Sequence, residues 1–210
     1  MSYSPKAADV QKLRQETGAG MMDCKKALVE TSGDYEEAKD LLRAQGLAGV
    51  QKRAGRAAAE GGVFAYIHQL DPALPAKIGV LVELNCETDF VAKTAEFKQL
   101  ARDIAMHIAA LDPRWVGRGD VPDDFLDREK KILLESDAVK GKPEQVVEKI
   151  LQGKIDLLLS GIGGVLTEQA FFKAEDGKQT VGDLVTDYAA QVKENILIRR
   201  FARYKVGVED

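Results

Sequence analysis

Residues whose side chains could do covalent chemistry gather in the stretch 83–93, which reads Glu-Leu-Asn-Cys-Glu-Thr-Asp-Phe-Val-Ala-Lys. Its thiol, Cys86, precedes two acids, Glu87 and Asp89, and His107 follows in the next apolar segment. In a thiol enzyme, such residues serve as nucleophile, orienting acid and general base. Cys86, however, ends an apolar run of strand length, where cysteine usually packs as a small hydrophobic residue. The pattern therefore favours a protein that makes no covalent change, with a thiol enzyme as the alternative.

Metal and nucleotide sites lack their usual sequence patterns. The two cysteines and two histidines of the chain are scattered without the spacing of metal ligands. No Gly-x-x-x-x-Gly-Lys-Ser/Thr loop occurs, and Gly-Ile-Gly-Gly at 161–164 matches a dinucleotide fingerprint poorly. We therefore expect no bound metal and no cofactor.

The tip of the 83–93 stretch, Thr88-Asp89-Phe90-Val91, places an acid beside a large aromatic ring. Turns ordinarily use Gly, Asn, Asp, Ser or Pro, so a phenylalanine in a turn needs another explanation. A ring offered to solvent is typical of a residue that enters a partner's pocket. The alternatives are that Phe90 folds back into the core and that Asp89 is only an acid at the start of a helix.

Apolar patterns on both sides of the tip predict the elements that hold it. Residues 78–82 form a mostly β-branched run typical of a buried strand. After the tip, apolar residues recur every three or four positions and predict a helix with one buried stripe. This helix could begin at Thr88 or at Thr94. We favour Thr94, because it leaves Asp89 and Phe90 free in a loop.

Three strands are predicted, at 63–68, 77–85 and 195–206, with the first two forming an antiparallel hairpin. Alternation along the third strand assigns its side chains to two faces. One face is predicted to hold Ile196, Ile198, Ala202, Tyr204 and Val206, and the other Leu197, Phe201 and Arg203. The fold class is α+β: a small three-stranded antiparallel sheet with helices packed on one face, behind an N-terminal three-helix domain.

The chain divides into an N-terminal domain of three short helices (1–47), a linker (48–62) and a core domain (63–210). The third N-terminal helix is predicted to end at Gly46. In the linker, Lys52, Arg53 and Arg56 could contact RNA or an acidic surface, but such charge runs are usually solvated connectors.

Residues 114–190 are predicted to be mainly helical. One helix covers 123–139, and a second begins at Pro143, a residue suited to the first helical position. Its end, 157–159, reads as a buried turn before a glycine-rich break. Thr180 and Asp183 resemble a capping box for a helix that extends to Val192.

The bulk composition, 45% hydrophobic and 30% charged, is that of a globular protein. The formal net charge of −4 disfavours a dedicated nucleic-acid binder. No signal peptide and no apolar run of membrane-spanning length is evident, so we expect a cytoplasmic protein whose thiols, Cys24 and Cys86, are both free.

Two long blocks resemble signatures of the translation elongation factor Ts family. One is the 83–93 stretch, and the other is 13–28, which reads Leu-Arg-Gln-Glu-Thr-Gly-Ala-Gly-Met-Met-Asp-Cys-Lys-Lys-Ala-Leu. The resemblance is clearest over residues 10–111 and at the C-terminal strand, and weak over 113–190. It implies a ubiquitin-associated-like N-terminal domain. Many members carry two copies of the core module, and this chain is expected to be a short form with one.

The resemblance also implies a function, guanine-nucleotide exchange on elongation factor Tu, without covalent chemistry and without membrane or direct nucleic-acid contact. The segment Thr88-Asp89-Phe90-Val91 matches the one that displaces magnesium in the partner. The further residues that would contact the partner are Arg14, Met21, Met22, Lys25 and His107.

Each of these residues also has a plainer interpretation. Arg14 and Lys25 could simply be solvated, and His107 could be a packed helix histidine. Met21 and Met22 cannot both point inward, so one is predicted to be exposed. The alternative function is a tethering module without exchange activity. Because a three-stranded sheet has exposed edges that a second copy could cover, we also predict a homodimer.

Overall fold

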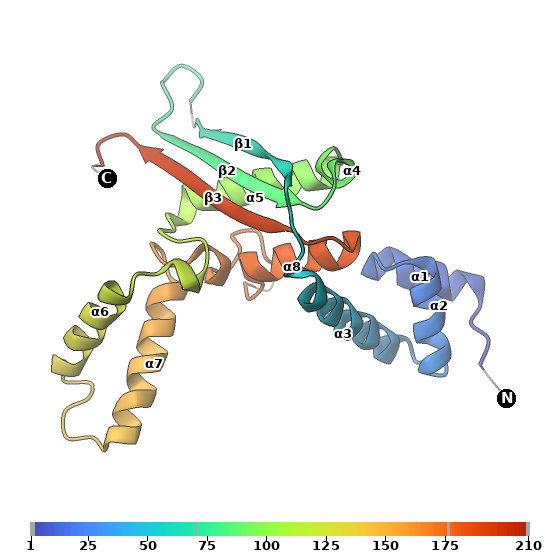
Figure 1. Cartoon of the computed structure of the whole chain (residues 1–210), viewed down its shortest axis with the longest axis horizontal. Coiled ribbons are helices and arrows are strands. Elements are labelled where there is room, and N and C mark those ends of the chain that lie inside the picture. Colours follow the sequence, from blue (N-terminus) through green and yellow to red (C-terminus); the bar gives the residue numbers. More distant parts are fainter. Residues whose placement is uncertain (1–2, 70, 176, 209–210) are drawn as a thin grey trace.

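The computed structural model describes residues 3–69, 71–175 and 177–208 and has the predicted α+β fold. Figure 1 shows a central sheet, N-terminal helices at one end of the long axis and a helical hairpin at the other. Along the chain the elements are α1 (Ala7–Thr17), α2 (Met21–Glu30), α3 (Tyr35–Arg53), β1 (Glu60–His68), β2 (Ile78–Cys86), α4 (Asp89–Ala92), α5 (Ala95–Leu111), α6 (Asp123–Glu135), α7 (Glu144–Ser160), α8 (Val181–Val192) and β3 (Leu197–Lys205), with short 3₁₀ turns at Arg118–Asp120 and Leu166–Glu168.

The sheet is antiparallel in the order β1-β2-β3, so the strand that leads to the tip is the central one. Alternate β2 side chains, Val80, Val82 and Leu84, are buried in one core cluster with residues of α5, including Phe97 and Ile104. Figure 1 shows α5 behind the sheet, and the opposite face uncovered. The predicted one-sided helical cover is confirmed.

The predicted faces of β3 are wrong, because the β2–β3 register shifts between Glu83 and Leu84. A bulge of this kind reverses the alternation of side chains on either side of it. Ile198 pairs with Leu84, whereas Phe201 pairs with Val82. Ile198 and Phe201 therefore share the face packed on α5, although a strict period of two assigns them to opposite faces.

The N-terminal helices have their own core, formed by Leu13, Cys24, Ala27, Leu28 and Ala38 with their neighbours. The predicted end of the third helix at Gly46 is wrong, since α3 continues to Arg53. A Cβ on Gly46 would lie 3.2 Å from the Cβ of Ala190 in α8. The glycine thus permits close packing of α3 on α8, and the first part of the predicted linker is helical.

Helices α6 and α7 form the projecting hairpin, with a small core at its base of Val121, Ile155, Leu159 and Val165. The first helix ends at Glu135, earlier than predicted, and Pro143 is the N-cap of the second. Of the predicted buried turn at 157–159, only Leu159 is fully buried, while Leu157 is 73% exposed.

The predicted capping box of α8 is confirmed and leads to a stability prediction. Thr180 Oγ1 accepts the N–H of Asp183, and Asp183 Oδ2 accepts the N–H of Thr180, both at 3.0 Å. Thr180→Ala removes one of these bonds and is expected to cost about 1 kcal/mol. For a protein of this size, the melting temperature should fall by roughly 2–4 °C in calorimetry. Thr180→Ser keeps the hydroxyl and is the control; equal melting temperatures for all three proteins would contradict the prediction.

Candidate functional site

The tip is built at the junction between β2 and α5 and uses both predicted helix starts. Thr88 accepts the N–H of Val91 and caps the one-turn helix α4. Thr94 then accepts the N–H of Phe97 and caps α5. The long helix therefore begins after Thr94 as predicted, but Asp89 and Phe90 lie in a turn of helix and not in a free loop.

Phe90 is 79% exposed, so the alternative in which its ring folds back into the core is wrong. Asp89 is the first residue of α4 and forms an ion pair with Lys93, one turn later. The hydrogen bond from Lys93 lowers the pKa of the Asp89 carboxyl, which keeps it ionised. The tip thus presents a bare aromatic ring beside a fixed negative charge.

The four predicted residues of the N-terminal domain, Arg14, Met21, Met22 and Lys25, are all exposed. Only one methionine was expected at the surface, and the structure exposes both. Met22 and Lys25 line a shallow depression on α2 together with Lys26, Val29 and Glu30. Sequence reasoning missed Val29, although its spacing of seven from Met22 places it on the same helix face.

His107 is fully buried on α5, so its ring contacts no partner in this conformation. Its Nδ1 accepts the N–H of Phe172 at 3.3 Å, and its Nε2 lies 3.1 Å from Oε1 of Gln169. The first bond requires an unprotonated Nδ1, so Nε2–H donates to Gln169. Gln169 in turn donates to the carbonyls of Leu111 and Gly161. His107 thus fastens the end of α5 to the segment after α7, and its contact with a partner stays a prediction.

Burial lowers the pKa of His107, and this shift gives a testable pH dependence of stability. The folded protein binds the proton less readily than the unfolded chain, so protonation favours unfolding. This contribution to stability is fully present above the ordinary histidine pKa and is lost as the pH falls below it. Between pH 7.5 and 5, the free energy of unfolding in urea should therefore fall more for wild type than for His107→Gln. Parallel pH profiles would contradict this.

The thiol-enzyme constellation does not assemble. Cys86 is buried, its Sγ donates to the carbonyl of Thr88 at 3.1 Å, and burial raises the pKa of its thiol. His107 has the other hydrogen-bond partners just given. In residues 3–69, 71–175 and 177–208, His, Cys, Asp and Glu form no group of three or more suited to hold a metal ion.

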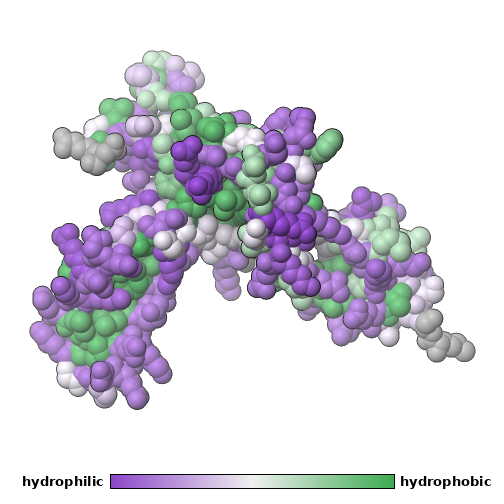
Figure 2. Space-filling view, viewed as in Figure 1, coloured by the Kyte–Doolittle hydropathy of each residue, from purple (hydrophilic) through white to green (hydrophobic). Residues whose placement is uncertain are grey.

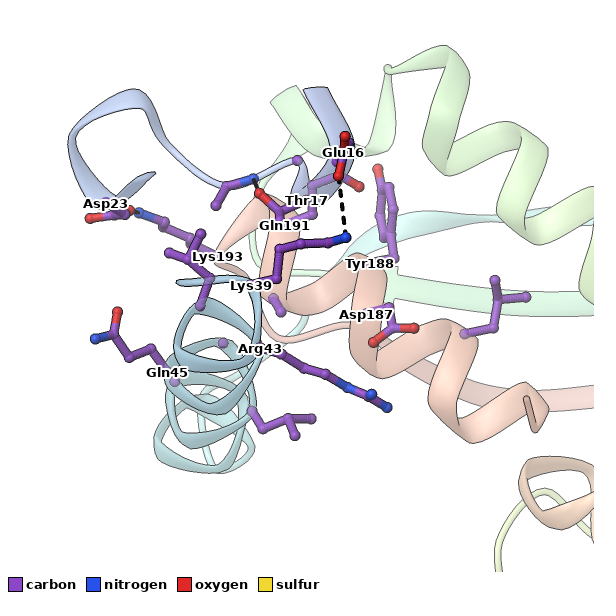
Figure 3. Close-up of a pocket in the computed structure, with 18 of the residues that line it drawn as sticks. Glu16, Thr17, Asp23, Lys39, Arg43, Gln45, Asp187, Tyr188, Gln191 and Lys193 are labelled. Carbon is purple, nitrogen blue, oxygen red and sulfur yellow. Dashed lines mark hydrogen bonds and ion pairs between the residues drawn. The ribbon is translucent and has the colours of Figure 1, made fainter. Parts of the chain in front are cut away.

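An open cleft of about 1300 Å³ is lined by residues of the N-terminal helices, α5 and α8, beside the contact of α3 with α8. Figure 3 shows charged side chains of both domains along it. Lys39 pairs with Glu16 at 3.3 Å inside the N-terminal domain, and Lys193 pairs with Asp23 at 2.7 Å between the domains. Only the second of these ion pairs crosses the cleft and joins the N-terminal helices to the core.

Two of the linker arginines make contacts within the protein. Arg53 donates to the carbonyl of Ala189 in α8, and Arg56 pairs with Glu87 at 3.4 Å. The connector interpretation agrees with the structure, since α3 covers this stretch up to Arg53 and the Arg56 side chain is 57% exposed. The two contacts add that Arg53 joins the end of α3 to α8, and that Arg56 joins the linker to the residue before Thr88.

Comparisons with known proteins agree with the sequence motifs. A family model described as Elongation factor TS matches residues 3–208. Elongation factor Ts of Syntrophomonas wolfei is 53% identical over 198 residues, which cover 94% of this chain and 88% of that protein. Elongation factor Ts of Moorella thermoacetica is 51% identical over 201 residues, covering 96% and 95%. The matches include residues 113–190, where motifs alone indicated little.

Across the described residues, none of the helices combines the length and apolar character that a membrane span requires.

Proposed function

Because the chain belongs to the elongation factor Ts family, we propose that it is a guanine-nucleotide exchange factor for elongation factor Tu. The observation that carries the proposal is the exposed ring of Phe90 on a helix turn capped at both ends. The backbone that carries this ring is already ordered in the free protein, so less conformational freedom is lost when the ring enters a partner's pocket.

Two surfaces of the protein support a docked arrangement. Figure 1 shows α4 and the N-terminal helices toward the same end of the long axis, with the hairpin at the other end. Exposed methionines such as Met21 and Met22 adapt to a partner surface at low cost. In the proposed complex, the N-terminal domain docks on the GTPase domain and the tip reaches the magnesium site.

In the proposed mechanism, the tip enters the partner's nucleotide site and displaces groups there by its bulk and its charge. Phe90 wedges between partner side chains, and Asp89 disturbs the groups that hold magnesium and phosphate. The ion is the largest local charge in such a site, so loosening it weakens the whole nucleotide site. A thousandfold faster release requires a barrier lower by about 4 kcal/mol. By reciprocity, GDP weakens binding of this protein equally, and the complex persists until GTP binds.

Release of fluorescent GDP from elongation factor Tu, followed by stopped flow, tests this function. Substoichiometric amounts of the protein should accelerate release, because an exchange factor turns over and consumes nothing. A tethering module would bind with the nucleotide present or absent and leave the rate unchanged. That result would overturn the proposal. The proposed role involves no covalent chemistry and places the protein in the cytoplasm.

The uncovered face of the sheet supports the proposed homodimer. Its exposed apolar side chains are Val63, Ile67, Leu81, Leu197 and Tyr204. Figure 2 shows hydrophobic residues over this face together with hydrophilic ones. Glu83 and Arg200 form an ion pair on this face. The face therefore carries a positive and a negative group, which could pair with the opposite groups of a second copy. Two such faces would pack as a sandwich, as sheets with one apolar face do.

A further inference from the structure

A carboxylate from the far end of the chain holds the tip. Glu194 lies between α8 and β3, and its Oε2 accepts the backbone N–H groups of Glu87 and Thr88, each at 3.0 Å. Its Oε1 accepts the hydroxyl of Thr88 at 2.5 Å. One half-buried side chain thus receives three donors from the two residues that precede α4.

Glu87 and Glu194 bind each other's neighbouring backbone reciprocally. Glu87 Oε1 accepts the backbone N–H of Asn195 at 2.7 Å, so each of two acids binds the backbone next to the other. This exchange occurs where the ladder between β2 and β3 ends, at the pair Asn85 and Leu197. Beyond that pair the ladder offers no partner to the N–H groups of Glu87, Thr88 and Asn195, and hydrogen bonds to a carboxylate are about twice as strong as neutral ones.

The residues on either side of Glu194 bind α2 and the linker. Lys193 pairs with Asp23 of α2, and the Asn195 side chain donates to the carbonyl of Arg56 in the linker at 2.8 Å. Residues 193–195 therefore contact the N-terminal domain, the tip and the linker in turn. This tripeptide therefore links the tip to the N-terminal helices, in addition to the packing of α3 on α8.

The short helix α4 needs such support. Four residues cannot sustain a helix alone, because helix nucleation is unfavourable. Its cap is a long bond of 3.4 Å from the N–H of Val91 to Thr88 Oγ1. Because the Thr88 hydroxyl proton points to Glu194, an oxygen lone pair is left for Val91. Glu194 thereby orients the hydroxyl that caps the turn bearing Phe90.

We infer that Glu194 is the positioning residue of the Phe90 tip. Its effect on nucleotide release rests on the proposed function, whereas its effect on the tip does not. Glu194→Gln is the main test, because it keeps the side-chain size but replaces one accepting oxygen with a donating NH₂ group. That group cannot accept the Thr88 hydroxyl. Glu148→Gln, at an exposed position on α7, is the matched control.

Amide hydrogen exchange of the free protein tests the positioning directly. In Glu194→Gln, exchange across 87–92 should be at least tenfold faster, while α5 and the centre of β2 stay as in wild type and in Glu148→Gln. Unchanged exchange at 87–92 would overturn the inference. Faster exchange throughout the core would also overturn it, since that would mean a general structural role.

Stopped-flow GDP release then tests the consequence. Glu194→Gln should lower the maximal stimulated rate about tenfold and leave the half-saturating protein concentration within twofold. In a Phe90→Ala background it should have no further effect, because a misplaced ring and a missing ring are equivalent. Full additivity of the two substitutions would overturn the inference. If wild type fails to stimulate release, the proposed function fails, and amide exchange alone decides the role of Glu194.

Discussion

Changing Phe90 to alanine is expected to lower the maximal rate of GDP release stimulated by this protein about 30-fold. Loss of a central aromatic anchor typically costs about 2 kcal/mol or more, and each 1.4 kcal/mol is tenfold in rate. The ring is 79% exposed, so its removal should leave the fold and melting temperature unchanged. The rate is measured with fluorescent GDP bound to elongation factor Tu.

The matched control for Phe90 is Ile162→Ala, which removes a side chain of nearly equal exposure, 77%, from the segment after α7. This control variant should stimulate GDP release from elongation factor Tu at the wild-type rate. Equal rates for wild type and Phe90→Ala would move the mechanism away from the wedge and leave the N-terminal contacts or Asp89 to account for release. A higher half-saturating concentration of Phe90→Ala with an unchanged maximal rate would make Phe90 a docking residue.

The features predicted correctly from sequence are those fixed by neighbouring residues. Thr94 and Thr180 cap their helices through groups three positions away, so the residue types alone indicate the geometry. An exposed Phe90 was inferred from the rarity of phenylalanine in turns, with a buried ring as the alternative, and the ring is exposed. The second strand was predicted from a continuous apolar run and the third from alternation, and the bounds of all three strands lie within three residues of the predicted ones.

The features that sequence reasoning missed depend on residues far apart in the chain. Gly46 was interpreted as a helix end because only α8, over 130 residues later, makes it a packing position. The β3 faces were misassigned because a bulge adds no residue type that marks it. Glu194 was not singled out, since its partners Glu87 and Thr88 precede it by more than 100 residues. For His107, the packed-histidine interpretation describes the free protein, but its partners Gln169 and Phe172 lie over 60 residues away and could not be named from sequence.

Leu81→Glu is expected to weaken the proposed homodimer at least a hundredfold. Leu81 lies on the central strand, paired with Ala65 and Ala202, and is 47% exposed on the uncovered face. In a symmetric interface the change buries two carboxylates, and each unpaired charge costs several kcal/mol. Sedimentation over a range of concentrations should show a wild-type dimer and a variant monomer.

Leu157→Glu distinguishes an interface on the sheet face from one on the exposed apolar residues of the helical hairpin. It places the same charge on α7, at a leucine that is 73% exposed on the hairpin. If the sheet face carries the dimer, this variant should sediment as wild type does. A dimer lost in Leu157→Glu but kept in Leu81→Glu would move the interface to the hairpin. A wild-type monomer at all concentrations would contradict the dimer and leave the sheet face available to another protein.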